Sequence, residues 1–296
     1  QVVAEADPQL INPLTDALPP QTVAASLNLP KDAEFAGPLD ADIVWIHRQT
    51  SDADIYFVAN RRDGAQDISA RFRVAGKEAE LWHPDTGKTE PAGYRSENGR
   101  TVVPLDLDPN DALFVVFRRA ARASSRTVPH PEETAVATVE GPWEVGFQPG
   151  RGAPASVTLE QLASWSNNSD AGVKYFSGTA TYTKNLDAPA QWFQPGARIL
   201  LDLGGVKNLA EVSVNGKDLG ILWKPPFRAD VTGALKPGAN ALQIKVTNLW
   251  VNRLIGDQQP GVTQKYAYTP MRFYRANARL LPSGLLGPVR VVRSAP

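Results

Sequence analysis

The most constraining feature of this sequence is an Asn-Gly pair between two alternating apolar runs, in the stretch VNGKDLG at residues 214–220. Both central residues of the tightest hairpin turns need positive φ angles, which Asn and Gly adopt more readily than other residues. The stretch therefore predicts a β-hairpin. The segments that follow, WKPPFRADVTGAL and KPGANALQIKV, continue the pattern of short apolar runs separated by turn residues.

Composition narrows the classes of protein that this chain can belong to. Its 296 residues leave room for about two domains of roughly 100–200 residues each. The 31 basic and 31 acidic residues cancel, and neither sign forms a long run, so we expect no nucleic-acid partner and no membrane-surface partner. The absence of Cys excludes disulfides, a thiolate nucleophile and a Cys-ligated metal site.

Residues 1–41 contain little strand pattern. Pro19 and Pro20 precede TVAASLNL, which predicts a short helix that ends before Pro30. The chain begins at Gln1, with neither an initiator Met nor a charged-then-apolar leader. We therefore expect residues 1–41 to be the tail of a preceding domain.

From residue 42 the pattern becomes an alternation of apolar and polar residues. Between the runs lie clusters of Gly and Asp, as in RRDGAQD and HPDTGK, which favour hairpin turns. Residues 42–120 are therefore predicted to form an antiparallel β-sandwich. Its six predicted strands are residues 43–47, 55–60, 68–74, 78–82, 101–107 and 112–117.

Residues 121–137 are small, polar and Pro-containing, which predicts an interdomain linker. A second all-β domain is expected over residues 138–296, with one short helical turn within residues 159–165. Its seven predicted strands are residues 141–147, 178–186, 198–204, 209–215, 217–223, 240–248 and 287–292.

The second domain contains a series of longer motifs in a fixed order. They are GPWEVGFQPGRG, then LDLGGVKNLAEVSVNGKDLGILWKPPF with KVTNLWVNRLIGDQ, and then LLPSGLLGPVRVV. Through these motifs the domain resembles the C-terminal part of glycoside hydrolase family 106, the bacterial α-L-rhamnosidases. WIHR, YFVANR and LWHPDTGK similarly resemble the sandwich that precedes it in that family. The implied fold is all-β, an antiparallel β-sandwich followed by a galactose-binding-like jelly roll, similar to the sugar-binding domain of family 2 glycosidases. Before them stands a short, mostly irregular or helical N-terminal segment.

The resemblance also implies a function. In family 106 the reaction takes place on a (β/α)-barrel, and nothing in this chain alternates helix and strand as a barrel requires. We therefore expect a non-catalytic accessory part of an α-L-rhamnosidase that braces the barrel and lines a sugar subsite. Its expected partners are that barrel and a rhamnose-containing glycoside. Family habit also favours a periplasmic or secreted protein.

The same resemblance implies a catalytic Ca²⁺ in the barrel. No cluster in this chain offers the several oxygen ligands that Ca²⁺ needs, so no cofactor is predicted here, and a structural Ca²⁺ in the jelly roll stays open. No catalytic residue is predicted either. Glycoside hydrolysis needs two carboxylates about 5–9.5 Å apart, and no spacing in the sequence marks such a pair.

One stretch, TNLWVNRLIGDQ, leaves a predicted strand and enters a long irregular segment. An aromatic ring stacks on the apolar face of a sugar, and amide, guanidinium and carboxylate groups bind its hydroxyls. Three interpretations remain open for this loop: it faces a ligand, it packs on the barrel, or it is local structure. The predicted sugar-binding or barrel-facing residues are Trp223, Asn248, Trp250, Asn252, Arg253 and Asp257.

Two other functions stay open from the sequence. A stand-alone carbohydrate-binding module would bind sugar through an exposed aromatic platform. A purely structural module would use its exposed apolar patches for association and bind no sugar. The aromatic and basic residues of the long loop favour an interface. These residues are Tyr266, Tyr268, Arg272, Phe273, Tyr274 and Arg275.

Overall fold

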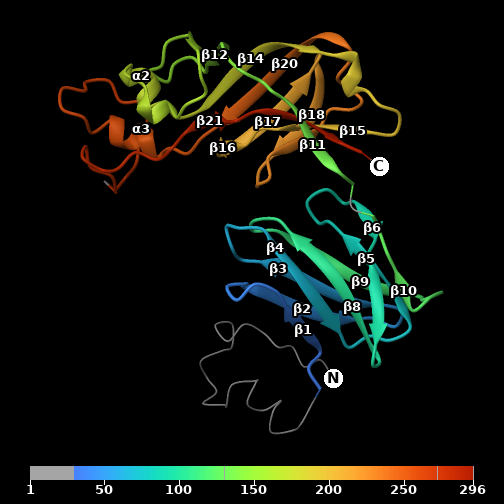
Figure 1. Ribbon diagram of the computed structural model, residues 1–296. Helices are drawn as coiled ribbons and strands as arrows, with labels where there is room; N and C mark the ends of the chain where they lie inside the picture. The colour runs from blue at the N-terminus through green and yellow to red at the C-terminus, as the bar shows by residue number, and fades with distance from the viewer. Residues whose placement is uncertain (1–29, 130, 272, 296) are drawn as a thin grey trace, which may run out of the picture. The chain divides into compact units, whose positions relative to one another are not determined.

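The computed structural model describes residues 30–129, 131–271 and 273–295 and divides the chain into two compact units (Figure 1). The N-terminal unit is Gln1–His130 and the C-terminal unit is Pro131–Pro296. The predicted all-β fold is confirmed, because both units are built from antiparallel sheets. The helix predicted before Pro30 lies outside the described residues.

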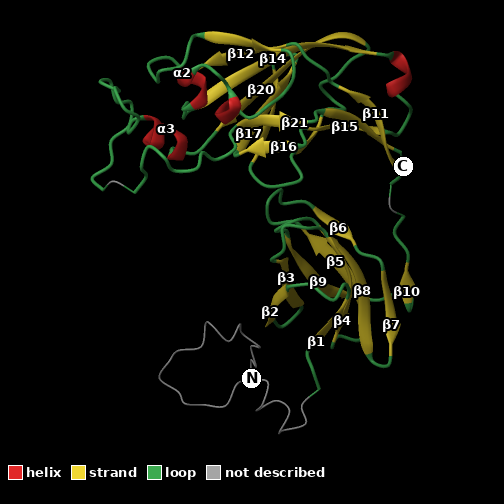
Figure 2. Ribbon diagram, turned by 60° about the vertical axis from the view of Figure 1, so that its left-hand side comes forward, coloured by secondary structure: helices red, strands yellow, loops and turns green. Residues whose placement is uncertain are grey.

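The N-terminal unit consists of two five-stranded sheets, which is the predicted antiparallel sandwich (Figure 2). All six predicted strands are present with small shifts of their ends. The first sheet has the order β1 (Ala33–Ala36), β4 (Gln66–Phe72), β8 (Arg100–Leu107), β7 (Tyr94–Glu97) and β10 (Ser125–Arg126). The second has the order β2 (Ile43–Gln49), β3 (Asp54–Asn60), β9 (Ala112–Ala120), β5 (Lys77–Trp82) and β6 (Thr89–Pro91).

Aromatic side chains fill the core of the N-terminal unit. Strand β3 alternates between buried and half-exposed residues, as a strand with one face on a core must. Its Tyr56 is fully buried, and the ring centroids of Phe72 and Phe117 lie 4.5 and 6.1 Å from the Tyr56 centroid. Offset and edge-on pairs of this kind add to the stabilisation gained from burial alone.

The structure differs from the prediction in two segments that were expected to hold no strand. Ala33–Ala36, expected within the tail of a preceding domain, forms β1 and pairs with β4. Within the expected linker, Glu133–Thr138 forms β11, which pairs with the last strand, β22 (Arg290–Ser294). Both strands are short or largely exposed edge strands, so their sequences lack the apolar alternation that identifies a strand.

The C-terminal unit has one long sheet and two smaller ones. The six-stranded sheet has the order β13 (Ser156–Leu159), β12 (Trp143–Phe147), β14 (Thr179–Ala188), β20 (Gly238–Thr247), β17 (Leu209–Val214) and β18 (Lys217–Leu222). The four-stranded sheet has the order β11, β22, β15 (Arg198–Asp202) and β19 (Arg228–Asp230). The third pairs β16 (Gly205–Lys207) with β21 (Gly284–Gly287).

The predicted hairpin is confirmed as β17–β18. Asn215 and Gly216 have φ angles of 53° and 78°, so both central residues of the turn occupy the left-handed region. Val214 pairs with Lys217 directly across this turn. The predicted helical turn is displaced: Leu159 ends strand β13, and a short 3-10 helix occupies Trp165–Asn167 instead.

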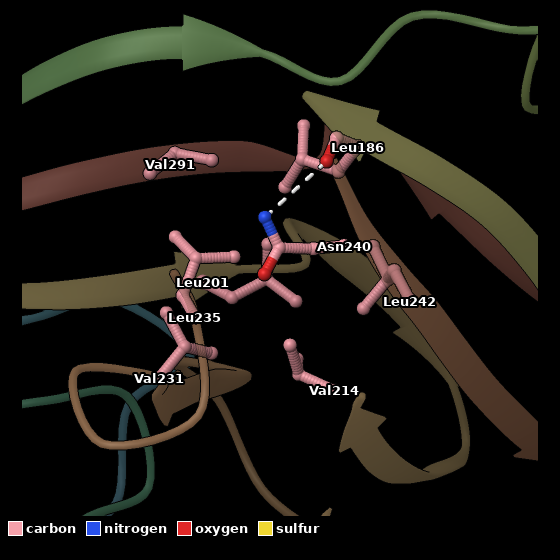
Figure 3. A pocket seen from close by; sticks show the side chains of 8 residues that line it. All are labelled: Leu186, Leu201, Val214, Val231, Leu235, Asn240, Leu242 and Val291. Carbon is pink, nitrogen blue, oxygen red and sulfur yellow. Dashed lines mark hydrogen bonds between the residues drawn. The ribbon is translucent and has the colours of Figure 1, made fainter. Parts of the chain in front are cut away.

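A buried asparagine fixes the start of β20. The Asn240 amide nitrogen donates to the carbonyls of Lys236 and Gly238, both at 2.7 Å. Its oxygen accepts from the Lys236 N–H at 2.9 Å and from Asn215 Nδ2 at 2.7 Å. Asn240 also lies beside an apolar cavity of about 10 Å³, lined by leucine and valine side chains (Figure 3). A cavity of this size holds at most about one water molecule, so this place is structural rather than a ligand site.

Short 3-10 and α-helical turns complete the described structure. They are α2 (Ala171–Lys174), α3 (Val251–Gly256) and 3-10 turns at Trp165–Asn167 and Ala190–Trp192. Among the described residues, no helix has the length and apolar character needed to cross a membrane.

We expect Asn240→Ala to destabilise the C-terminal unit by about 2–4 kcal/mol, because several partly buried donors and acceptors lose their partner at once. Urea unfolding followed by tryptophan fluorescence measures this loss. Asn185→Ala is the matched control, since Asn185 is exposed on β14. Equal stability of the two variants would contradict the role assigned to Asn240.

A charged network ties β1 to β2 and β4 in the N-terminal unit. His47 Nδ1 lies 2.6 Å from Asp32 Oδ2, and Arg73 Nη2 donates to Asp32 Oδ1 at 2.8 Å. Burial of Asp32 opposes its ionisation, but the hydrogen bond and charge of His47, followed by those of Arg73, outweigh it. The pKa of Asp32 is therefore held below its usual value.

Because the pKa of Asp32 is lowered by folding, this carboxylate stabilises the protein above the pKa of an unfolded Asp, at about pH 4. The stabilisation is lost as the pH falls through the lower folded pKa. We expect urea unfolding at a series of acid pH values to show a weaker pH dependence for Asp32→Asn than for the unaltered chain. Asp67→Asn, on the exposed face of β4, serves as the control. An unchanged slope in Asp32→Asn would refute this assignment.

Candidate functional site

The predicted site segment begins where the central strand β20 ends. After Thr247 the chain passes through Asn248 and Trp250 into helix α3, and then follows a long irregular path to Ser283 and β21. Helix α3 was not predicted, because VNRLIG is too short to establish a helical periodicity. Helices α2 and α3 lie at the same end of the sheets (Figures 1 and 2).

Asn248 connects the end of β20 to the segment after α2. Its side-chain oxygen accepts from the Gly178 N–H at 3.0 Å, and its Nδ2 donates to the Phe176 carbonyl at 2.9 Å. Ser177 Oγ adds a hydrogen bond of 2.9 Å to the Leu249 carbonyl. The Asn248 side chain is buried, and both of its polar ends are already used within the chain.

Asn252 holds the far end of the long loop. Its Nδ2 donates to the Leu281 carbonyl at 2.8 Å, and its Oδ1 accepts from the Leu281 N–H at the same distance. The Ser283 hydroxyl lies 3.4 Å from the same Nδ2. Only 2% of Asn252 is exposed, so this amide joins α3 to the segment before β21 rather than facing solvent.

Arg253 and Asp257 form a buried ion pair one helical turn apart. Arg253 Nε lies 2.9 Å from Asp257 Oδ1, although the two atoms lack hydrogen-bond alignment, and both residues are at most 5% exposed. Asp257 Oδ2 accepts the backbone N–H groups of Tyr266 and Ala267 at 3.1 and 2.8 Å. The carboxylate therefore organises the loop from inside.

Aromatic rings enclose this ion pair. The Arg253 guanidinium lies 5.2 Å from the centroid of Tyr266 and 6.0 Å from that of Tyr175, distances typical of cation–π contacts. Gly256 allows this packing, because a Cβ there would meet Tyr175 Cβ at 2.6 Å. The ion pair is thus enclosed and is not available as a sugar-binding pair.

The two predicted tryptophans are exposed. Trp250 is 51% exposed, with the Arg151 guanidinium 5.2 Å from its ring centroid. Trp223, directly after β18, is 58% exposed. The loop adds further exposed apolar side chains, namely Leu249, Tyr268, Met271 and Phe273.

A pocket of about 190 Å³ lies beside the end of β20. It is smaller than the roughly 300–1,000 Å³ sites of drug-sized ligands, and its volume suits a single sugar ring. Two predicted residues, Asn248 and Asn252, line it, while the other four do not. Its full lining is Lys207, Asn208, Asn248, Leu249, Val251, Asn252, Leu281, Pro282 and Ser283.

Seven of the nine pocket residues were not predicted, among them the polar residues Lys207, Asn208 and Ser283. Lys207 and Asn208 lie at the end of β16, far from the loop in sequence, and Ser283 lies where the loop ends, just before β21. No local motif marks them, because only the pairing of β16 with β21 brings the two segments together.

Within the described part of the chain, no group of three or more His, Asp or Glu side chains could hold a metal ion. His47 and His83 each lie beside carboxylates, with His83 Nε2 3.1 Å from Glu90 Oε1. Both histidines are therefore engaged by neighbouring carboxylates, and His130 lies outside the described residues.

We expect Asp257→Ala to loosen the loop that follows α3, because the Tyr266 and Ala267 amides lose their acceptor and Arg253 loses its counter-charge. Hydrogen exchange of these amides should accelerate about tenfold or more. Asp257→Asn keeps an acceptor and should show a smaller change, whereas Asp187→Ala, at an exposed position on β14, should show none. Unaltered protection in Asp257→Ala would show that the carboxylate does not order the loop.

Comparison with known families agrees with this geometry. A family model described as alpha-L-rhamnosidase matches residues 14–96. A second, described as glycosyl hydrolase 2 galactose-binding domain-like, matches residues 163–279, a range that contains β14 to α3 and most of the pocket lining.

Two individual relatives extend this similarity. The rhamnosidase structure from Novosphingobium sp. PP1Y is 47% identical, with a TM-score of 0.85, over 93% of this chain and 26% of that one. A protein of Formosa agariphila named "Putative beta-glucuronidase" is 37% identical over 76% of this chain and 21% of that protein. The chain thus spans about a quarter of these relatives. It is related to the α-L-rhamnosidases of glycoside hydrolase family 106 and carries a galactose-binding-like domain of the glycosyl hydrolase 2 type.

Proposed function

We propose that this chain is a non-catalytic accessory part of an α-L-rhamnosidase, which supports the catalytic domain and lines a sugar subsite. The observation that carries the proposal is the pocket of about 190 Å³ at the end of β20. It has the volume for one sugar ring and no carboxylate in its lining. It also lies in a chain that corresponds to about a quarter of a rhamnosidase.

The surroundings of four described carboxyl groups differ from those that a general acid needs. A glycosidase needs a general acid whose pKa is raised, so that it is protonated when the bond breaks. In Asp32, Glu80, Glu90 and Asp230, burial raises the pKa of the carboxyl group, but hydrogen bonds and neighbouring charges outweigh it and hold the pKa below its usual value. Asp257 is occupied by Arg253 and two backbone N–H groups.

The exposed loop residues support the bracing role. Trp250, Tyr268, Met271 and Phe273 are each more than half exposed and follow one another along the loop that Asp257 organises. Large apolar side chains gathered on one loop are typical of an interaction surface. We propose that this surface packs against the catalytic domain of the same enzyme.

One observation favours a second candidate, a stand-alone carbohydrate-binding module. Trp223 and Trp250 are both more than half exposed, so their rings are accessible for stacking on the apolar face of a sugar. In that case the chain would bind sugar through these rings without any catalytic partner, and Trp250→Ala would abolish binding while a pocket variant would not.

The proposal is tested by incubating the purified chain with p-nitrophenyl α-L-rhamnopyranoside at high protein concentration. We expect no hydrolysis. Hydrolysis that disappears in Asn208→Ala, a pocket variant, but persists in Asn185→Ala would overturn the accessory role, because the reaction would then take place in this chain. Hydrolysis that persists in both variants would be assigned to a contaminating enzyme.

The subsite part of the proposal is tested by titrating the ¹⁵N-labelled chain with L-rhamnose. We expect chemical-shift changes of pocket amides such as Asn208 and Ser283. Changes confined to the indole N–H signals of Trp223 and Trp250 would favour the binding-module alternative. The absence of any change would leave only the bracing role.

A further inference from the structure

We propose that the pocket beside β20 binds an acidic sugar unit, and that Lys207 recognises its carboxylate. This inference rests on the proposed function and deepens it, because it names the chemical class of glycoside that the subsite accepts. It starts from the charges of the pocket lining. Lys207 is the only charged residue among the nine that line the pocket.

Lys207 has no counter-charge within the described chain. Its ammonium group forms no hydrogen bond or ion pair with any described residue, unlike those of Lys77, Lys88 and Lys245, which each contact a carboxylate. Its ammonium group therefore gives the pocket a net positive charge. A negatively charged ligand forms an ion pair with this ammonium group. Beside a neutral sugar the group stays hydrated by water.

The rest of the lining suits a sugar ring. Asn208 is half-buried, and its side-chain amide has no partner among the described residues, so it offers both a donor and an acceptor to hydroxyl groups. The apolar wall is formed by Leu249, Val251, Leu281 and Pro282. A pyranose presents hydroxyls at its edge and C–H groups on its face, which matches an amide beside an apolar wall.

The framework of the pocket is fixed before any ligand arrives. Asn248 and Asn252 lie in its wall, but their amides are hydrogen-bonded to Gly178, Phe176 and Leu281. The Asn208 N–H donates to the Thr247 carbonyl at 2.9 Å, which holds the segment carrying Lys207 against the end of β20. A preformed wall lowers the entropic cost of binding.

The number of cations points to a carboxylate rather than a phosphate. A phosphate monoester carries nearly two charges near neutral pH, and its usual sites combine several donors or cations. One lysine balances one carboxylate. The ligand class is thus a uronic acid unit, either as a neighbour of the rhamnose or as a branch of the same glycoside.

The inference is tested by titrating the ¹⁵N-labelled 296-residue chain with methyl α-D-galacturonoside and with methyl α-D-galactoside, which differ by a carboxylate in place of a hydroxymethyl group. We expect the acidic glycoside to bind about tenfold more tightly, as the loss of a charged hydrogen bond predicts. The preference for the acidic glycoside should weaken at high salt. Binding should shift the amide signals of the pocket residues Asn208, Leu249 and Ser283.

Three variants sharpen the test. Lys207→Gln should remove the preference for the acidic glycoside, and Lys207→Arg should keep it. Lys236→Gln, which removes an exposed charge near the opposite end of β20, should change nothing. Equal binding of both glycosides, no binding of either, or a preference that survives in Lys207→Gln would each overturn the inference. The accessory role is decided separately by the hydrolysis assay, so the two failures are distinguishable.

Discussion

The C-terminal unit depends on two buried asparagines that secure the central strand β20 at its two ends. Asn240 holds the turn that leads into the strand, and Asn248 connects its exit to the segment after α2. Between them β20 pairs with β14 over ten residues and with β17 over six. A buried polar group without a hydrogen-bond partner costs folding free energy, so these two amides specify where the strand begins and ends. The apolar side chains of β20 specify which face of the strand is buried.

This arrangement explains why a pocket exists where it does. The chain leaves β20 at Asn248, and the same bend passes Leu249 before α3 begins at Val251. The pairing of β16 with β21 then brings two other segments to the same place. The pocket is therefore a consequence of strand ends meeting, as is common for binding sites placed on β-sandwich scaffolds.

The sequence predicted the long strands well, and it named two of the nine residues that line the pocket. Thirteen runs of alternating residues became strands, because alternation reports a strand with one buried face. Nine strands of the described chain were not predicted, since short or exposed strands carry little apolar signal; they are β1, β6, β7, β10, β11, β13, β16, β19 and β21. At the candidate site, residue types selected the segment after β20 but not the direction of each side chain. Arg253 and Asp257 have the chemistry of sugar ligands, yet they pack inward on tyrosine rings, a tertiary contact that local sequence does not encode.

Asn252 lies where the long loop and the pocket meet. Its amide joins the first turn of α3 to Leu281, so the two ends of the long loop are held together at one point. The described residues between Asn252 and Leu281 do not line the pocket. Changes in the length or sequence of the loop between Asn252 and Leu281 can therefore leave the pocket lining in place.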